Sequence, residues 1–238
     1  MSPYKKIAII LARGGSKRLP SKNVLPFHGK PMVAWSVIAA VESGEFTRVV
    51  VSTDDEAIAS ICRRYGAEVP FLRSGAADDL ATSSSATSLA LTQAEEHWGE
   101  QYDCVAQLMA NCPLRDALDI RDSINVFTNG SSPSQVSCFR FGWMNPWWAF
   151  NNTSTGHEYL FPEAIKARSQ DLPHLHCPSG ALWLASVNHF KEHQTFYMAD
   201  HSFYPLSWIS AMDIDDEDDF QMAKAAYLIK HKLVGQDV

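Results

Sequence analysis

The stretch Ile7-Ala-Ile-Ile-Leu11 decides the fold when it is taken with the loop that follows, Ala12-Arg-Gly-Gly-Ser-Lys-Arg-Leu-Pro-Ser-Lys-Asn23. The first part is an unbroken apolar run, which is typical of a buried parallel strand. Gly14 and Gly15 then follow where that strand ends, and glycine can adopt positive φ and let main-chain N–H groups approach a ligand closely. Four cations surround the pair, namely Arg13, Lys17, Arg18 and Lys22. The pattern predicts a site for a polyphosphate.

This loop differs from the two common glycine motifs for phosphate groups. It lacks the spacing Gly-x-x-x-x-Gly-Lys-Ser/Thr, which excludes a P-loop NTPase, and it lacks Gly-x-Gly-x-x-Gly, which excludes the dinucleotide-binding fingerprint. A surface loop that is basic by accident is the alternative interpretation. The strand-loop-helix context favours the phosphate site.

The rest of the first half alternates between strand and helix patterns. Apolar runs predict buried parallel strands at 7–11, 48–52 and 104–109. Helical periodicity covers 31–43, 55–65 and 84–98, and Gly66 is placed to end the second of these helices. The alternation predicts an α/β fold with a doubly wound, mostly parallel sheet. Because ligands gather beyond the carboxyl ends of such strands, we expect three loops to meet in one crevice: 12–23, 72–83 and 110–115.

Composition limits the class of protein. With 238 residues, 46% of them hydrophobic, the chain is long enough for one α/β domain with a full core. The formal net charge of −7 argues against general affinity for nucleic acid or anionic membranes, but it permits a local basic pocket for an anionic metabolite. No apolar run approaches about 18 residues and no signal-peptide pattern opens the chain, so we expect neither membrane spanning nor export.

The five cysteines are scattered and never occur in Cys-x-x-Cys spacing, which predicts a cytoplasmic protein. Most of them are explained as small buried hydrophobes. His174 and His176, next to Cys177, form the one cluster that suits a transition metal. Without a second ligand pair, this spacing is more typical of solvated surface histidines.

The pattern changes near residue 130. Gly130-Ser-Ser-Pro-Ser134 is a break, and Phe139–Phe150 then contains six aromatic residues. One interpretation of these aromatic residues is a strand pair that closes over the core. An interface explains them in another, because large apolar patches mark partner surfaces.

Several motifs carry a family resemblance. The first loop reproduces Arg-x-x-Ser-Lys-x-x-x-x-Lys-Asn through Arg13, Ser16, Lys17, Pro20, Lys22 and Asn23. Further blocks follow in family order: Gly29–Met32, Val51–Asp55, Tyr65–Val69, Cys112–Arg115 and Met212–Asp215. The chain thus resembles, over most of its length, the acylneuraminate cytidylyltransferases, which make CMP-activated nine-carbon sugar acids. The segment Arg168–Pro173 is similar to the pseudaminate cytidylyltransferase branch in particular.

The resemblance implies a Rossmann-like nucleotidyltransferase fold over 1–238. It also implies an inserted arm at approximately 135–180, which dimerises and reaches into the neighbour's sugar pocket. We therefore expect a homodimer. Its substrates would be CTP and a nonulosonic acid, and its products the CMP-sugar and pyrophosphate.

The first loop then supplies most of the nucleotide site. The residues implied there are Arg13, Gly14, Gly15, Ser16, Lys17, Lys22 and Asn23. Attack on the α-phosphate requires a neutralised triphosphate and an aligned nucleophile. Arg13 and Lys17 are expected to hold the triphosphate and Lys22 to lie near the α-phosphate, so these three form the catalytic set. The family pattern does not require Arg18. A solvated surface side chain is an equally good interpretation of this residue.

Base selection is expected from the second loop. Arg73 can donate to the cytosine carbonyl oxygen, and the resemblance gives Ser83 a contact with cytosine. Ser83 is also explained as a plain helix cap, which serine favours. The neighbouring Thr82 carries a hydroxyl that could take the same role.

Asp213 and Asp215 form the expected metal pair. On a short strand their carboxylates would point to one face, roughly 7 Å apart, and could share a hard cation such as Mg2+. Asp is depleted in strand interiors, which favours metal binding over a structural role for Asp213. The acidic run at 216–219 is interpreted as a helix N-terminus.

The sugar acid carries a carboxylate, and Arg168 with Gln170 is the expected clamp for it. Arg115 is a weaker candidate, because it more simply opens and pins a helix. The chain has Met109 where sialate enzymes commonly have glutamine, and Ser179-Gly180 where they have Asn-Gly. Trp183 is expected in the sugar pocket, with core packing as its alternative.

These departures predict a deoxy, diamino sugar acid of the pseudaminic or legionaminic type over N-acetylneuraminic acid. Two other functions stay open. One is a related enzyme for another acceptor, such as the eight-carbon acid Kdo or a methylerythritol phosphate. The other is a non-catalytic nucleotide-binding protein, which would not need the full set of cations and aspartates.

Overall fold

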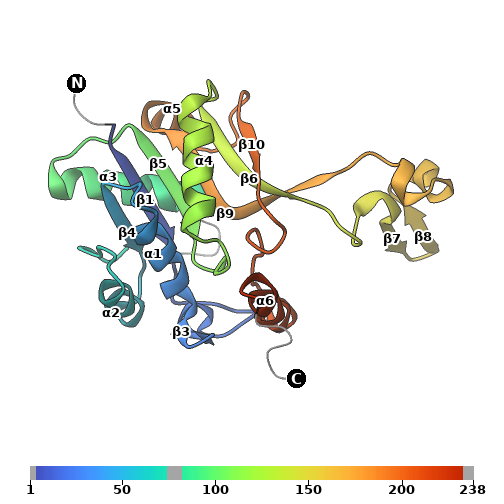
Figure 1. Cartoon of the computed structure of the whole chain (residues 1–238), viewed down its shortest axis with the longest axis horizontal. Helices are drawn as coiled ribbons and strands as arrows, with labels where there is room; N and C mark the ends of the chain where they lie inside the picture. Colours follow the sequence, from blue (N-terminus) through green and yellow to red (C-terminus); the bar gives the residue numbers. More distant parts are fainter. Residues whose placement is uncertain (1–3, 74–81, 233–238) are drawn as a thin grey trace.

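The computed structural model describes residues 4–73 and 82–232. In this part of the chain a central six-stranded sheet has the order β10-β6-β9-β5-β1-β4 (Figure 1). Its strands are β1 (Lys6–Leu11), β4 (Arg48–Ser52), β5 (Cys104–Met109), β6 (Ser134–Arg140), β9 (His176–Ser186) and β10 (Ser202–Pro205). β1 pairs in parallel with β4 and β5, and β10 with β6, whereas β9 runs antiparallel to β5 and β6. The predicted α/β fold with a mostly parallel sheet is therefore confirmed.

Helices cover both faces of this sheet. They are α1 (Met32–Ser43), α2 (Glu56–Arg64), α3 (Ser83–Trp98), α4 (Ala117–Asn129), α5 (Val187–His193) and α6 (Glu217–Lys230). Apolar residues of α1, α2 and α4 pack with Ala8 and Ile10 on one face of β1. Residues of α3 and α5 pack in a second cluster with Ile7 and Ile9 on the other face. The sheet is thus doubly wound, as predicted.

Local sequence explains where these elements begin and end. The three predicted strands coincide with β1, β4 and β5, because each is a mostly apolar run that is buried along nearly its whole length. The Asp55 side chain starts α2 by accepting bonds from the N–H groups of Ala57 and Ile58, at 2.7 and 3.2 Å. Gly66 follows the helix with φ of 98°, the left-handed conformation that favours glycine.

The C-terminal helix packs against the segment that follows the first loop. This segment contains a short 3-10 helix η1 (Lys22–Val24) and a hairpin of β2 (Pro26–Phe27) and β3 (Lys30–Pro31). Ala223 and Ala226 of α6 share one apolar cluster with Phe27 and Ile214. Burial of these side chains holds the residues before α6 next to the first loop.

A long protrusion leaves the sheet between β6 and β9 (Figure 1). It contains η2 (Pro146–Trp148), the hairpin of β7 (Phe150–Thr153) and β8 (Gly156–Tyr159), η3 (Pro162–Lys166) and η4 (Ser169–Asp171). We call the segment 141–175 the arm. Large apolar side chains are exposed on it, including Trp143 at 84%, Phe150 at 52% and Leu160 at 52%. Across the described residues, no helix has both the length and the apolar character needed to cross a membrane.

Candidate active site

A cavity of about 460 Å³ lies beside Leu11 and Met109, the last residues of β1 and β5. Three predicted loops contribute to it, which agrees with the expected crevice. The first gives Arg13, Ser16, Lys17, Arg18, Lys22 and Asn23, the second Arg73, Thr82 and Ser83, and the third Asn111. Asp215 completes the polar lining from a distant part of the chain. Residues 74–81 of the second loop lie outside the described residues.

The first loop is held by its own side chains and by the start of α2. Asn23 Nδ2 donates to Arg13 O at 2.8 Å, and the N–H of Gly14 donates to Asp54 Oδ1 at 2.8 Å. The positive φ expected at Gly14 and Gly15 is not found. Gly14 is needed for a different reason, because a Cβ there would lie 2.9 Å from Asp55 Oδ2.

The second loop places a buried guanidinium at the cavity. Arg73 is 7% exposed, its N–H donates to Thr53 O at 2.7 Å, and its Nε has no partner among the described residues. Burial lowers the pKa of Arg73, the nearby Asp54 opposes this, and Arg13 adds to it. A desolvated donor of this kind suits an uncharged carbonyl acceptor as well as an anion.

Ser83 does not cap α3, although a helix cap was the alternative role considered for it. Thr82 is the N-cap of α3, and its Oγ1 accepts from the N–H of Ser85 at 3.1 Å. Ser83 is the first residue of the helix and also lines the cavity. The capping role therefore belongs to Thr82, and the Ser83 hydroxyl is not the cap.

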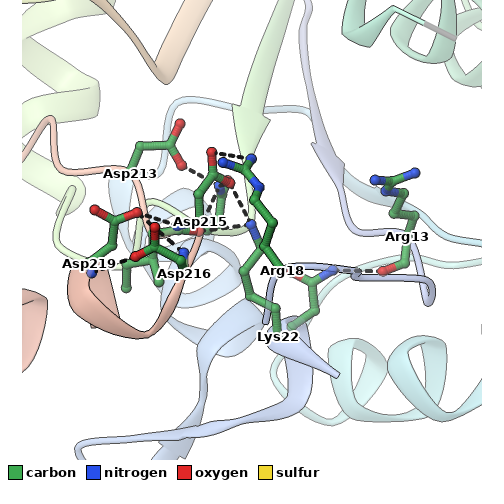
Figure 2. A network of polar contacts seen from close by, with 10 residues as sticks. Arg13, Arg18, Lys22, Asp213, Asp215, Asp216 and Asp219 are labelled. Carbon is green, nitrogen blue, oxygen red and sulfur yellow. Dashed lines mark hydrogen bonds and ion pairs between the residues drawn. The ribbon is translucent and has the colours of Figure 1, made fainter. Parts of the chain in front are cut away.

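Asp213 and Asp215 lie near each other (Figure 2), and both contact the side chain of Asn111. The Asn111 Nδ2 donates to Asp213 Oδ1, and it lies 3.4 Å from Asp215 Oδ1 and 3.1 Å from Ile214 O. Residues 212–215 do not form the predicted strand. The Ile214 N–H instead donates to Asn111 O at 2.9 Å, so one residue at the end of β5 holds this segment in place.

Two cations neutralise Asp215 (Figure 2). Lys22 Nζ lies 2.8 Å from Asp215 Oδ1, and Arg18 Nη2 lies 2.6 Å from Asp215 Oδ2. Burial acts to raise the pKa of Asp215, but the hydrogen bonds and charges of Lys22 and Arg18 hold that pKa below its ordinary value. Asp215 is therefore ionised at neutral pH.

Asp213 has a different environment. Its side chain is open to solvent on one side, yet burial against neighbouring atoms and the charge of Asp215 raise the pKa of Asp213 to about 6. Two carboxylates this close repel each other, and a divalent cation between them would favour the ionised form of both.

Asn111 is a site residue that the sequence motifs do not identify. It lines the cavity, contacts both aspartates, and has a buried Oδ1 without a partner among the described residues. Its place just after a predicted strand was the available signal, since polar residues at the carboxyl ends of parallel strands face the ligand crevice.

Of the predicted sugar contacts on the sheet, Met109 and Gly180 lie next to each other, and Gly180 also lies near Asp213. A Cβ on Gly180 would lie 2.9 Å from Met109 Cγ and 3.7 Å from Asp213 Oδ2. Ser179 is buried and its Oγ donates to Ala211 O at 2.8 Å, while Trp183 Nε1 donates to Ser179 O at 2.6 Å. Of the predicted sugar contacts, all of which are described residues, Met109 alone lines the cavity.

Arg168 and Gln170 lie on the arm, which extends away from the sheet (Figure 1), and neither residue lines the cavity. The Arg168 side chain is 73% exposed and its Nε lies 2.6 Å from Asp171 Oδ2. Arg115 is fully buried and donates through Nη1 to Ala181 O, so it ties the loop after β5 to β9, in keeping with a pinning role. The chain therefore does not bring Arg168 or Gln170 to its own nucleotide loop.

Among the described residues, the fold brings no further metal-ligating side chains to His174 and His176. Over residues 4–73 and 82–232, no group of three or more His, Cys, Asp or Glu side chains is placed to hold a metal ion. His174 and His176 therefore lack the additional ligands that a transition-metal site needs. Asp213 and Asp215 remain a pair of carboxylates, which suits a hard cation that takes its other ligands from substrate and water.

Known proteins match this chain over most of its length. A family model described as Cytidylyltransferase covers residues 7–205. A pseudaminic acid cytidylyltransferase of Campylobacter jejuni subsp. jejuni serotype O:23/36 (strain 81-176) is 33% identical over 230 residues, which cover 96% of this chain and 98% of that protein. A CMP-N,N'-diacetyllegionaminic acid synthase of Legionella pneumophila subsp. pneumophila is 32% identical, with coverage of 92% and 94%.

Solved structures agree on the fold. A CMP:2-keto-3-deoxy-manno-octonic acid synthetase complexed with CTP has a TM-score of 0.67 at 17% identity, covering 95% of this chain and 99% of its own. At that identity the likeness shows the fold alone. The resemblance inferred from the loop motifs is confirmed, and the chain belongs to the cytidylyltransferase family, whose members are CTP-dependent nucleotidyltransferases.

Proposed function

We propose that this cytidylyltransferase joins CTP to a nonulosonic acid of the pseudaminic type, with Mg2+ as cofactor, as a cytoplasmic homodimer. The observation that carries the proposal is the lining of one cavity. Five basic side chains from two loops and the carboxylate of Asp215 meet there, among its described residues, at the ends of β1 and β5. The relatives named for pseudaminic and legionaminic acids support this substrate class. Five free thiols agree with a reducing cytoplasm.

The cations of the first loop account for phosphate binding. Arg13 and Lys17 would hold the triphosphate, and Lys22, fixed beside Asp215, would face the α-phosphate. The sugar hydroxyl attacks the α-phosphorus, the bond to the β-phosphate oxygen breaks, and pyrophosphate leaves. Positive charge fixed beside the leaving group stabilises the charge that develops there. Arg73 and Ser83 would contact the cytosine ring.

The residues around Asp213 and Asp215 fit a magnesium ion. Both carboxylates approach the same Asn111 amide group, so their oxygens converge on one place at the cavity wall. Oxygen ligands of this kind suit Mg2+, which prefers one or two carboxylates together with substrate phosphates. When bound, the ion supplies charge that neutralises the triphosphate.

The sugar pocket would lie on the Asp213 side, against Met109 and Gly180. Met109 offers no amide to a sugar hydroxyl, which favours a less hydroxylated, more apolar acid. A steady-state comparison of pseudaminic acid with N-acetylneuraminic acid tests this. We expect the higher kcat/KM for pseudaminic acid, and Met109→Gln should move the ratio toward N-acetylneuraminic acid. A wild-type preference for N-acetylneuraminic acid contradicts the assignment.

The arm supports a dimer in which each chain completes its neighbour's sugar site. Its exposed Trp143 and Phe150 suit burial in an interface. Arg168 is charged and exposed and does not line its own cavity, so it would serve as a carboxylate clamp, with Gln170, only in a second copy. Light scattering should give the mass of two chains. Trp143→Asp should yield a monomer that still binds CTP but transfers to the sugar poorly. A fully active monomer would overturn this arrangement.

Activity is tested by pyrophosphate release with Mg2+, each of the four NTPs, and pseudaminic, legionaminic, sialic and Kdo acids. CTP should be strongly preferred, and EDTA should stop turnover. Asp215→Ala should lower kcat by orders of magnitude without changing the melting temperature much, whereas Asp218→Ala, an exposed carboxylate in the first turn of α6, should not. Equal use of ATP, or full activity in EDTA, rejects the proposal, and turnover with Kdo alone favours the other acceptor.

A further inference from the structure

Arg18 is a residue of the first loop that the motif leaves without a role. Its guanidinium Nη2 lies 2.6 Å from Asp215 Oδ2, a contact between residues 197 positions apart. The side chain is 67% exposed and lines the same cavity as Arg13 and Lys17. A cation of the phosphate loop is thus paired with a carboxylate of the expected metal site, and it is not simply a solvated side chain.

Both oxygens of Asp215 are engaged by cations. Lys22 takes Oδ1 at 2.8 Å and Arg18 takes Oδ2. A metal ion that coordinates Asp215 therefore meets a cation at either oxygen and competes with it for the charge of the carboxylate. They compete because the metal ion and the basic side chain each place positive charge close to the carboxylate.

Arg18 is the partner that can leave. Lys22 is held in place, since its side chain is 15% exposed and its Nζ also donates to Ile214 O at 2.8 Å. Arg18 is far more exposed, and an ion pair exposed to solvent is weak. Its planar fork also matches a phosphate group better than an ammonium does.

We propose that Arg18 exchanges partners during nucleotide binding. Without nucleotide it neutralises Asp215, and when the metal and CTP bind it moves from Asp215 to the triphosphate while the metal takes the freed carboxylate oxygen. Each charge keeps a partner before and after the exchange. The inference rests on the proposed use of CTP with a divalent metal, and it adds that Arg18 couples the binding of the two.

The exchange makes predictions of opposite sign for two ligands. Removing Arg18 removes a competitor of the metal, so Mn2+ alone should bind more tightly. It also removes a phosphate ligand, so CTP should bind more weakly. Mn2+ binding is measured by electron paramagnetic resonance without nucleotide, and CTP binding by calorimetry with Mn2+ present.

The variants are Arg18→Ala, Arg18→Lys and a control, Arg64→Ala. Arg64 is an exposed arginine at the end of α2, so its loss changes the net charge equally. For Arg18→Ala we expect about twofold to fivefold tighter Mn2+ binding, the range for an exposed ion pair, and at least about fivefold weaker CTP binding. Arg18→Lys should fall between wild type and Arg18→Ala on both measures, and Arg64→Ala should match wild type.

The outcomes separate this inference from the proposed function. If wild type binds no CTP with Mn2+, the proposed function fails. If wild type binds it but Arg18→Ala matches Arg64→Ala on both measures, the exchange is wrong and the function stands. Weaker CTP binding with unchanged Mn2+ binding makes Arg18 a plain phosphate ligand, and tighter Mn2+ binding with unchanged CTP binding makes it only a counter-ion. Either result overturns the exchange.

Discussion

Lys230, the last residue of α6, joins three segments that are distant in sequence. Its Nζ has four oxygen neighbours, which are Leu114 O at 2.6 Å, Asp116 Oδ2 at 2.8 Å, Ser210 Oγ at 3.0 Å and Asp119 Oδ2 at 3.3 Å. Asp116 and Asp119 form the capping box that starts α4, and Ser210 precedes the Asp213–Asp215 segment. We predict that Lys230→Met loosens all of these connections at once.

The magnitude follows from the contacts that are lost. Methionine keeps an apolar stem of similar length but leaves the Leu114 carbonyl and two carboxylates without their cation. Each hydrogen bond to a charged group contributes about 1.5 to 3 kcal/mol. The Lys230 side chain is only 19% exposed, so water replaces these bonds in part. We expect a loss of about 2 to 3 kcal/mol in the free energy of unfolding, or roughly 5 to 10 °C in melting temperature.

The loss should depend on pH in a defined direction. Burial acts to raise the pKa of Asp116, but its hydrogen bonds and the charge of Lys230 lower that pKa below its ordinary value. A lowered pKa gives stability that is present above the unfolded-state value of about 4 and is lost as pH falls through the folded-state value. The difference between wild type and Lys230→Met should therefore be full at pH 7 and shrink in acid below about pH 4.

Urea unfolding at several pH values measures both effects. The matched control is Lys224→Met, a lysine of the same helix whose Nζ makes two weak contacts, 3.4 Å from Gln221 Oε1 and 5.8 Å from the centroid of the Phe220 ring. Its cost should stay within about 0.5 kcal/mol. If Lys230→Met and Lys224→Met unfold at the same urea concentration at pH 7, the reasoning about this network is refuted.

Three further changes test other contacts. Gly14→Ala should cost about 1 kcal/mol, because its Cβ would displace Asp55 from the start of α2, and a urea midpoint equal to wild type would contradict this. Gly180→Ala should push Met109 toward the sugar side and raise KM for the sugar more than for CTP, as steady-state kinetics can measure; equal changes count against it. Burial lowers the pKa of His28, so the free energy of unfolding should fall as pH drops through about 6.5. In a His28→Gln variant the urea midpoint should change less between pH 7 and about 5.5, and a profile parallel to that of wild type would refute this.

The first half of the fold could be predicted because its signals are local. β1, β4 and β5 are short, mostly apolar runs, and the capping Asp55 and terminal Gly66 bound α2 within the same short stretch. The antiparallel strand β9 could not be placed in this way. Its partners β5 and β6 are chosen by packing in the finished sheet, a non-local contact that periodicity does not report.

The candidate site divides in the same manner. The loop cations belong to one motif and line one cavity, whereas the contacts of Asp215 with Lys22 and Arg18 join opposite ends of the chain. The strand expected at Asp213 and Asp215 does not form, and the Ile214 N–H instead donates to Asn111 O. These two residues are 103 positions apart in the sequence. Such pairings depend on the folded topology, and the local pattern of alternating aspartates contains no trace of them.

In the proposed function, strand order separates the expected nucleotide site from the expected sugar site. β1 and β5 lie side by side and carry the nucleotide loops, while β9 lies on the far side of β5 and comes directly from the arm. Gly180 of β9 lies against Met109 of β5, which lines the cavity, so we expect a change in either residue to reshape the proposed sugar side. A chain built this way can keep one phosphate-binding loop and accept a different sugar acid through changes confined to the end of β5, β9 and the arm.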